Sequence, residues 1–383
     1  MAKISSFELM AIDLPFKNPF KHAAAERASS NSIFLKCTLD DGTSGFGETL
    51  PREYVTGESR DSTFAMLQDR ILPHLIGKEF SSMDDCVKSM QLHNGKASPE
   101  WVELEEPQTA AWCAVELALL DAYGHQFKCS IFDGLKSIRS DLRYSAVISA
   151  DNSLKIIKTA LKIKFYGIKQ LKLKVDKQVN TRALQILRKV LGRSTDIRVD
   201  ANMEWTEEEA LEAMQEMSRY SVTSFEQPIL ANDLDGLARL VAATNLDIMA
   251  DESLNDETSL QALIDTRACT AVNVRIAKCG GLIAALRRCQ SAIEAGLKIQ
   301  IGCQVGESSL LSAAQLALIA QVSEVRYLEG CFGLHLLSED PVTPLLQFSH
   351  GGKIPSFPMG NGLGVTINED CLRRHVSKTA VIE

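Results

Sequence analysis

Charged side chains recur at a nearly constant interval through the middle of the sequence, each near the end of an apolar segment. The intervals are 26, 26, 25 and 24 residues between Lys174, Asp200, Glu226, Asp251 and Arg275. A strand, a turn, a helix and a return loop need about that many residues, so the interval is typical of a repeating βα unit. In a parallel α/β barrel, the carboxyl ends of the strands converge on one face, where active sites are built. The spacing therefore predicts that these charges meet around one point.

The sequence from Tyr144 onward alternates between short apolar strands and amphipathic helices. Eight strands can be counted, from YSAVIS to VRYLEGC. The chain has 383 residues, which is enough for a barrel of roughly 250 residues and a second, smaller domain. The fold class that we predict is therefore α/β, with an eight-stranded (β/α)₈ barrel of the TIM type.

The region before the barrel mixes strands and helices. Residues 1–15 alternate as a strand, a hairpin turns at Asp41-Gly42, and residues 61–135 have a helical pattern. Two irregular stretches interrupt this region, Phe16–Asn31 and Pro51–Ser59. Long loops in compact domains often form lids, so we expect both to cover the site; ordinary hairpin connections are the alternative.

The composition limits the class of partner. The net charge is −8 and the isoelectric point is near 5.5, which argues against a nucleic acid or an anionic membrane as partner. Ten cysteines are spread singly with no CxxC pair, a pattern typical of reduced thiols. We find no signal-peptide hydrophobic region and no apolar run of membrane-spanning length. The sequence therefore predicts a soluble, cytoplasmic protein.

Three of the spaced residues are carboxylates on successive predicted strands. Asp200, Glu226 and Asp251 would bring hard oxygen ligands together without histidine or cysteine. Such a set suits Mg²⁺, with Mn²⁺ as a possible substitute. The alternative is three unrelated helix caps at strand ends. Because the three occur in register, we favour a metal site.

The cations near these carboxylates are candidates for proton transfer. Lys172 and Lys174 are two apart on a strand, so both point into the barrel. A desolvated lysine can act as a base near neutral pH, whereas the alternative is that one lysine only neutralises carboxylates. We expect Lys172 near a substrate carboxylate and Lys174 as the base. Arg275 shares the parity of Asn273 and should also point inward. Lys278, three residues later, should point away as a surface or loop residue.

Further polar residues are candidates for substrate binding. Arg52 and Lys21 in the two irregular stretches are candidate contacts for an anionic substrate, although we favour a solvated surface charge for Lys21. The other candidates lie near the ends of predicted strands: Asn202, Gln304, Glu307 and Glu329.

The motifs together resemble a known family. KxK, D-x-N, E-Q-P, A-D-E-S and a strand ending C-G-G resemble the muconate lactonizing subgroup of the enolase superfamily. This subgroup includes muconate cycloisomerases, o-succinylbenzoate synthases and dipeptide epimerases. GFGE and VTGE resemble the capping domain of the family, and GLGV resembles its C-terminal segment. The resemblance implies an α+β capping domain at 1–135, a modified (β/α)₈ barrel at 136–345, and a C-terminal segment at 346–383 that returns to the cap.

The resemblance also implies a chemistry. The shared step of the family is Mg²⁺-assisted removal of the proton α to a carboxylate, which gives an enediolate. By match, Asp200, Glu226 and Asp251 would hold Mg²⁺ and Lys174 would be an acid/base. The substrate would be a small carboxylate, and we expect a homo-oligomer.

Two departures from the family pattern bear on the reaction. Arg275 stands where two-base members carry a second lysine, and arginine stays protonated. Strand eight offers only Glu329 where related dipeptide epimerases carry D-x-D. The leading hypothesis is therefore a one-base lyase or isomerase that performs dehydration or cycloisomerisation. The alternatives are a racemase or epimerase of an amino-acid derivative or dipeptide, and a non-catalytic metal-binding barrel.

Overall fold

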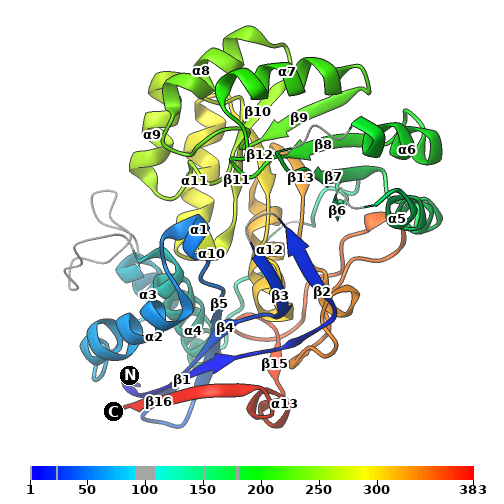
Figure 1. Cartoon of the computed structure of the whole chain (residues 1–383). Coiled ribbons are helices and arrows are strands. Elements are labelled where there is room, and N and C mark those ends of the chain that lie inside the picture. Colours follow the sequence, from blue (N-terminus) through cyan, green and yellow to red (C-terminus); the bar gives the residue numbers. More distant parts are fainter. Residues whose placement is uncertain (1, 23–24, 91–107, 136, 150–151, 178–180) are drawn as a thin grey trace.

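The computed structural model describes residues 2–22, 25–90, 108–135, 137–149, 152–177 and 181–383. The described chain forms an eight-stranded barrel and a separate antiparallel sheet with its own helices (Figure 1). One hydrophobic cluster lies within the cap, and a larger one fills the barrel and continues into the cap through residues such as Phe34 and Leu117. This arrangement confirms the predicted barrel with a capping domain.

The barrel strands are all parallel, and each pairs with the strand that follows it in the sequence. They are β6 (Ala146–Ser149), β7 (Gln170–Lys174), β8 (Asp196–Asp200), β9 (Val222–Glu226), β10 (Asp247–Ala250), β11 (Ala271–Val274), β12 (Lys298–Ile301) and β13 (Val325–Leu328). A parallel bridge between Tyr144 and Leu328 joins the two ends of the sheet. The predicted count of eight strands is confirmed.

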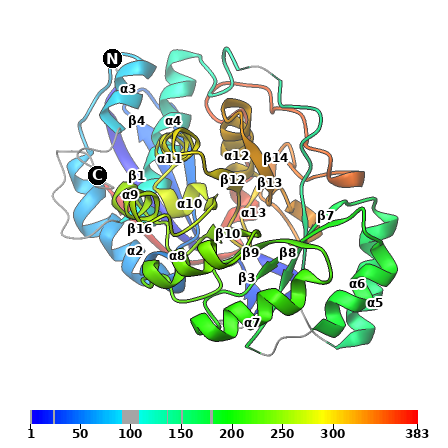
Figure 2. The ribbon, with the colours of Figure 1, turned by 90° about the horizontal axis from the view of Figure 1, so that it is seen from above.

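Helices follow each barrel strand except the last and surround the strands when the molecule is seen from above (Figure 2). They are α5 (Ser153–Phe165), α6 (Thr181–Leu191), α7 (Glu207–Ser218), α8 (Leu234–Ala243), α9 (Glu257–Thr266), α10 (Ile276–Cys279), α11 (Leu282–Glu294) and α12 (Ser309–Gln321). Gly167 ends α5 with a φ of 77°, as expected for a residue just past a helix. Directly after β13 the chain forms the short 3₁₀ helix η3 (Gly333–His335) in place of an α-helix, which is why the barrel is a modified one.

The antiparallel sheet joins both ends of the chain. Its order is β16-β1-β4-β5, formed by β1 (Ile4–Ile12), β4 (Ser32–Leu39), β5 (Ser44–Thr49) and β16 (Val376–Ile382). The tail reaches β16 through β14 (Val342–Thr343), η4 (His350–Gly352), β15 (Thr366–Ile367) and α13 (Glu369–Arg373). Because β16 pairs with β1 along its length, the C-terminal segment returns to the cap as predicted.

A long buried helix, α4 (Thr109–Phe127), packs on this sheet. The other helices of the cap are α1 (Glu53–Thr56), α2 (Arg60–Met66), η1 (Leu67–Ile71), η2 (Leu72–His74) and α3 (Met83–Met90). A Cβ added to Gly47 of β5 would lie 2.0 Å from the Ala114 carbonyl oxygen, and one added to Gly45 would lie 2.1 Å from the Ala122 nitrogen. Only glycine opposite alanine permits this approach, which explains the glycines of the GFGE segment.

The stretch predicted as the irregular loop Phe16–Asn31 is instead a hairpin, and this prediction is wrong. Its strands are β2 (Pro15–His22) and β3 (Ala25–Ser29). Phe16 also bridges Leu337, and the Ser338 amide donates to the Pro15 carbonyl at 2.8 Å. Pairing of β2 with β3 thus makes strands from residues of low strand propensity, and the distant segment fixes the start of β2.

Two findings bear on the class of protein. In the part of the chain that the structure describes, no helix is both long and apolar enough to cross a membrane. All ten cysteines are free thiols, and eight of them are buried, as the pattern of single cysteines predicts.

Candidate active site

The predicted charges meet at the carboxyl end of the barrel. Asp200 and Glu226 are the last residues of β8 and β9, and Asp251 follows β10 directly. All three carboxylates are fully buried. Lys172 and Lys174 on β7 point to the same group. The register of neighbouring strands pairs Lys174 with Asp200 and Asp200 with Glu226. Residues that recur at a constant spacing in the sequence therefore lie side by side at one level of the barrel.

The two lysines have different surroundings. The Lys172 ammonium lies 2.7 Å from Glu329, 3.2 Å from Glu226 and 3.3 Å from Asp200. Burial would lower the pKa of Lys172, but these carboxylates outweigh burial and raise it. The Lys174 ammonium donates to Asn202 at 2.8 Å and lies 3.2 Å from one oxygen of Asp200. Lys172 is therefore held as a cation, whereas Lys174 has a single carboxylate partner.

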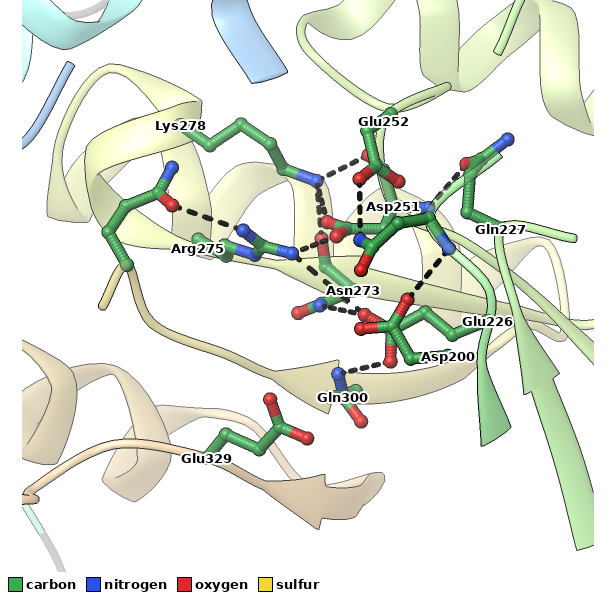
Figure 3. Close-up of polar contacts among 12 residues, drawn as sticks. Asp200, Glu226, Gln227, Asp251, Glu252, Asn273, Arg275, Lys278, Gln300 and Glu329 are labelled. Carbon is green, nitrogen blue, oxygen red and sulfur yellow. Dashed lines mark hydrogen bonds and ion pairs between the residues drawn. The ribbon is translucent and has the colours of Figure 1, made fainter. Parts of the chain in front are cut away.

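Arg275 and Lys278 both contact Asp251 (Figure 3). Arg275 also donates to Gln304 at 3.1 Å and lies 3.9 Å from Glu226. The Lys278 ammonium donates to Asp251 Oδ1 at 2.9 Å and to the Asp251 carbonyl at 2.6 Å. Burial and the nearby Arg275 lower the pKa of Lys278 to about 7.

The prediction that Lys278 is a surface or loop residue is wrong, because its side chain is fully buried. The prediction assumed that the strand continues, so that a residue three positions later would face away. The chain instead enters α10 at Ile276. Residues three apart on a helix lie on one side, which returns Lys278 to the same carboxylate as Arg275.

Amide side chains complete the site and were not assigned a role from the sequence. Asn273 and Gln300 donate to the two oxygens of Glu226 at 2.8 and 3.2 Å. Gln227 accepts from the Asp251 amide at 2.9 Å. These residues share one signal, a polar side chain inside or just after a strand with both faces covered. Their hydrogen bonds set the orientation of the carboxylates.

The donor set fits a hard divalent cation. Oxygen Oδ2 of Asp200 is buried and accepts no hydrogen bond of good geometry, and Oε2 of the neighbouring Glu252 is also unpartnered. Burial, followed by the charge of Asp200, raises the pKa of Glu252 to about 7. However, Lys172 bridges Asp200 and Glu226, and Arg275 bridges Glu226 and Asp251. The protein's own cations therefore balance the carboxylates, and a metal would have to displace part of this network.

A cavity of about 210 Å³ opens beside these groups. Six of its lining residues are polar candidates from the sequence, namely Lys172, Lys174, Asn202, Arg275, Gln304 and Glu329. The remaining wall is mostly apolar or aromatic and includes Tyr54, Val147, Val305, Phe332 and Leu336. The cavity is thus lined partly by charged and amide side chains and partly by apolar and aromatic ones.

Two candidates for substrate binding, Arg52 and Glu307, do not line this cavity. Arg52 is buried and donates to the carbonyls of Pro51, Ser30 and Val305 at 2.8, 2.8 and 2.9 Å. Glu307 accepts from the Gln304 amide at 2.6 Å. Both therefore hold the loop that presents Gln304. The side chain of Lys21 lies outside the described residues.

Comparison with known proteins agrees with this geometry. Residues 155–371 match the enolase C-terminal domain-like family, and residues 6–135 match the N-terminal domain of mandelate racemase and muconate lactonizing enzyme. The chain belongs to the mandelate racemase and muconate lactonizing enzyme family of the enolase superfamily.

Several characterised members of this family are similar along most of the chain. An N-succinyl-L-Arg/Lys racemase of Bacillus cereus is 27% identical over 97% of both chains. Its crystal structure has a TM-score of 0.85 at 26% identity, with all of both chains covered. An L-Ala-D/L-Glu epimerase of Clostridium acetobutylicum is 28% identical over 83% of this chain and 87% of the relative. Muconate cycloisomerase 1-2 of Acinetobacter lwoffii is 27% identical over 99% of this chain and 98% of the relative.

Proposed function

We propose that this chain is a Mg²⁺-dependent enzyme that removes the proton α to a carboxylate with Lys174 as its one base. The product would form by dehydration or by cycloisomerisation. The observation that carries the proposal is the pair of groups facing each other across the cavity. Three strands lie between β7 and β11 in a sheet of eight, so Lys174 and Arg275 approach a bound substrate from opposite sides. Arginine stays protonated in proteins, so Arg275 cannot serve as a base on its side.

The roles of the two lysines follow from their partners. Lys172 contacts three carboxylates and keeps its charge, which suits it to bind the substrate carboxylate. Lys174 faces the cavity with one carboxylate and one amide partner, so it is the better placed to accept a proton. Arg275 would stabilise negative charge on the reacting carbon skeleton without exchanging a proton.

Asp200, Glu226 and Asp251 would hold the Mg²⁺ ion, because they supply buried oxygen ligands from three neighbouring strands. When bound, the divalent ion supplies the positive charge that makes a weakly acidic α-proton removable. Asp251 would exchange its contacts with Arg275 for the ion, and this exchange would free the guanidinium to face the substrate.

The apolar wall restricts the substrate. Tyr54, Phe332 and Leu336 surround the opening of the cavity. Glu329, the carboxylate of strand eight, is already paired with Lys172 and Arg198. We therefore favour a small carboxylate with an uncharged tail over one that carries a free ammonium group.

A second candidate is a racemase or epimerase. It is favoured by the relatives of known activity, among them an N-succinyl-amino-acid racemase and a dipeptide epimerase. In that case another group would have to exchange protons on the Arg275 side, because the family's second lysine is absent. Lys278 is the nearest lysine on that side, but it does not line the cavity.

The two candidates differ in stereochemistry, which deuterium exchange can measure. Sugar acids, amino-acid derivatives and cyclic acids would be incubated with the Mg²⁺ enzyme in D₂O, followed by chiral analysis. We expect product formation with exchange at one face only. The Lys174→Ala variant should lose exchange by about 10²–10⁴-fold, whereas Lys177→Ala, which alters an exposed lysine outside the cavity, should not.

Two outcomes would contradict the proposal. Deuterium in both enantiomers at comparable rates would show that a second base is at work. The protein would then be a racemase or epimerase. Metal binding without exchange in any acid of the library would indicate a non-catalytic barrel.

A further inference from the structure

Outside the residues that line the cavity, a carboxylate, a thiol and an imidazole converge on the C-terminal tail. Glu339 lies in the segment between η3 and β14, Cys371 lies on α13, and His375 lies just past the end of that helix. Each offers one ligand atom, and these atoms lie within 4.8 Å of one another. Cys371 and His375 are four residues apart, so one helical turn brings both to the same side. Among the described residues, these three form the one group of carboxylates, thiols and imidazoles whose ligand atoms all lie this close together.

The three side chains are already in contact. Glu339 Oε1 lies 2.5 Å from His375 Nε2, and Glu339 Oε2 accepts from the Cys371 thiol at 3.1 Å. Arg374 donates to the same Oε2 at 2.8 Å. Hydrogen bonds from Cys371, His375 and Arg374 lower the pKa of Glu339 to about 2. An ionised carboxylate therefore lies next to two groups that become metal ligands when they lose a proton.

The chemistry of this donor set differs from that of the barrel site. Sulfur, imidazole nitrogen and carboxylate oxygen together suit zinc, whereas an all-oxygen set suits magnesium. Zinc–ligand distances of about 2.0–2.3 Å place the ligand atoms of a tetrahedral site roughly 3.3–3.8 Å apart. The contacts of 2.5 and 3.1 Å would thus need to open by only about 1 Å, which side-chain rotation permits.

We propose that Glu339, Cys371 and His375 bind one zinc-type transition-metal ion, with water in the fourth position. Binding releases the thiol proton and any proton on His375 Nε2 to solvent, and the ion takes their place. One carboxylate oxygen then binds the metal, while the other stays hydrogen-bonded to Arg374. The ion can reach the site because Glu339 and His375 are partly exposed.

The position of the site indicates what the ion would stabilise. The Asp13 amide donates to the His375 carbonyl at 2.9 Å, and the Ser338 amide donates to the Pro15 carbonyl at 2.8 Å. The ion would thus cross-link α13 to the segment around Ser338, which is hydrogen-bonded to the first residue of β2 (α13 and β2 are labelled in Figure 1). A metal here joins the returning tail to the chain that follows the last barrel strand.

Cobalt(II) is the probe that tests this site, because a cysteine ligand gives it a thiolate charge-transfer band in the near ultraviolet. The full-length protein would be titrated with Co²⁺ in excess Mg²⁺, which occupies oxygen-only sites. We expect one equivalent to give this band and Zn²⁺ to abolish it by displacement. Cys371→Ser should remove the band, and His375→Gln should weaken Co²⁺ binding by more than about 10-fold.

The control is Cys129→Ser, because Cys129 is a partly exposed thiol outside the group, whereas Cys371 is buried. This variant should keep the band and the affinity of the natural protein. Absence of a thiolate band in the natural protein would overturn the proposal. Persistence of the band in Cys371→Ser would overturn it as well, since another cysteine, such as Cys303 in the cavity, would then be the ligand.

Discussion

The contact between Arg275 and Asp251 is central to the chemistry of the barrel site. Asp251 is fully buried, and its carboxylate forms ion pairs with both Arg275 and Lys278. Breaking one partner of a buried pair is costly unless another charge replaces it. A divalent ion at Asp251 would do so, and metal binding is therefore coupled to the position of Arg275.

Substitution of Glu226 tests whether this residue is a metal ligand. We predict that Glu226→Gln abolishes binding of Mg²⁺ or Mn²⁺, because it removes a charged ligand from the middle of the three strands. Titration calorimetry of the substrate-free protein measures this. Glu208→Gln, at an exposed position of α7, serves as the control and should bind normally. Equal affinity in the two variants would exclude Glu226 as a ligand.

Arg275→Lys tests the one-base assignment. A lysine keeps the charge but loses the planar fork, and it can titrate. We expect a slower native reaction, together with new exchange of the α-proton from the second face. Chiral analysis of the deuterated substrate detects this gain. If the variant exchanges only from the face used by the natural enzyme, a base at position 275 cannot reach the reacting carbon.

Short elements rather than long ones bring the side chains of the cap and the loops to the cavity. The four-residue helix α1 presents Tyr54 to the cavity. Gly57 ends this helix with a φ of 76°, a conformation that only glycine adopts readily. The second irregular stretch, Pro51–Ser59, therefore does reach the barrel mouth through a single aromatic side chain.

We predict that Tyr54→Ala mainly raises KM, by about 10-fold, because it removes apolar contact with the substrate tail and leaves the charged end intact. Steady-state kinetics with the substrate found in the acid screen measures the effect. Tyr54→Phe keeps the ring and should stay close to the natural enzyme. A drop in kcat at unchanged KM would instead assign Tyr54 to the chemical step.

At the scale of the molecule, buried carboxylates of the cap hold the N-termini of two helices, one in the barrel and one in the cap. Glu48 on β5 accepts from the amide and hydroxyl of Ser308, the residue that caps α12. Glu58 accepts from the first amides of α4 at Ala110 and Ala111. The glutamates of the GFGE and VTGE segments thus accept hydrogen bonds at the N-termini of buried helices.

Glu48 makes stability depend on pH. Burial raises the pKa of Glu48 from 4.5 to about 8. The folded state therefore keeps a proton that the unfolded state loses between about pH 4.5 and 8, so stability falls as pH rises through this window. Glu48→Gln should flatten the fall by up to about 1.4 kcal/mol per pH unit. Burial also raises the pKa of Glu116 to about 8, so part of the fall should remain.

Urea unfolding at several pH values measures this slope. Glu53→Gln on the exposed side of α1 is the control and should leave the slope unchanged. An identical slope in Glu48→Gln and the natural protein would show that Glu48 is ionised in the folded state at neutral pH.

The sequence by itself determined the barrel and the residues at its centre. Strand and helix periods are local properties, and a repeat of about 25 residues in register can be built only as successive βα units. The positions of Lys174, Asp200, Glu226 and Asp251 follow from that repeat, because each ends or follows a parallel strand. The motifs are local as well, and they indicate the family to which the chain belongs.

The tertiary structure alone decided which neighbouring charges belong to the site. Lys278 turned inward because the chain becomes helical one residue after Arg275. Arg52 is held by carbonyls from two distant segments, and Phe16, near the start of the β2–β3 hairpin, bridges Leu337. In each case the partner lies elsewhere in the chain. Periodicity describes how a segment is shaped, whereas burial and hydrogen bonding depend on what the rest of the fold places beside it.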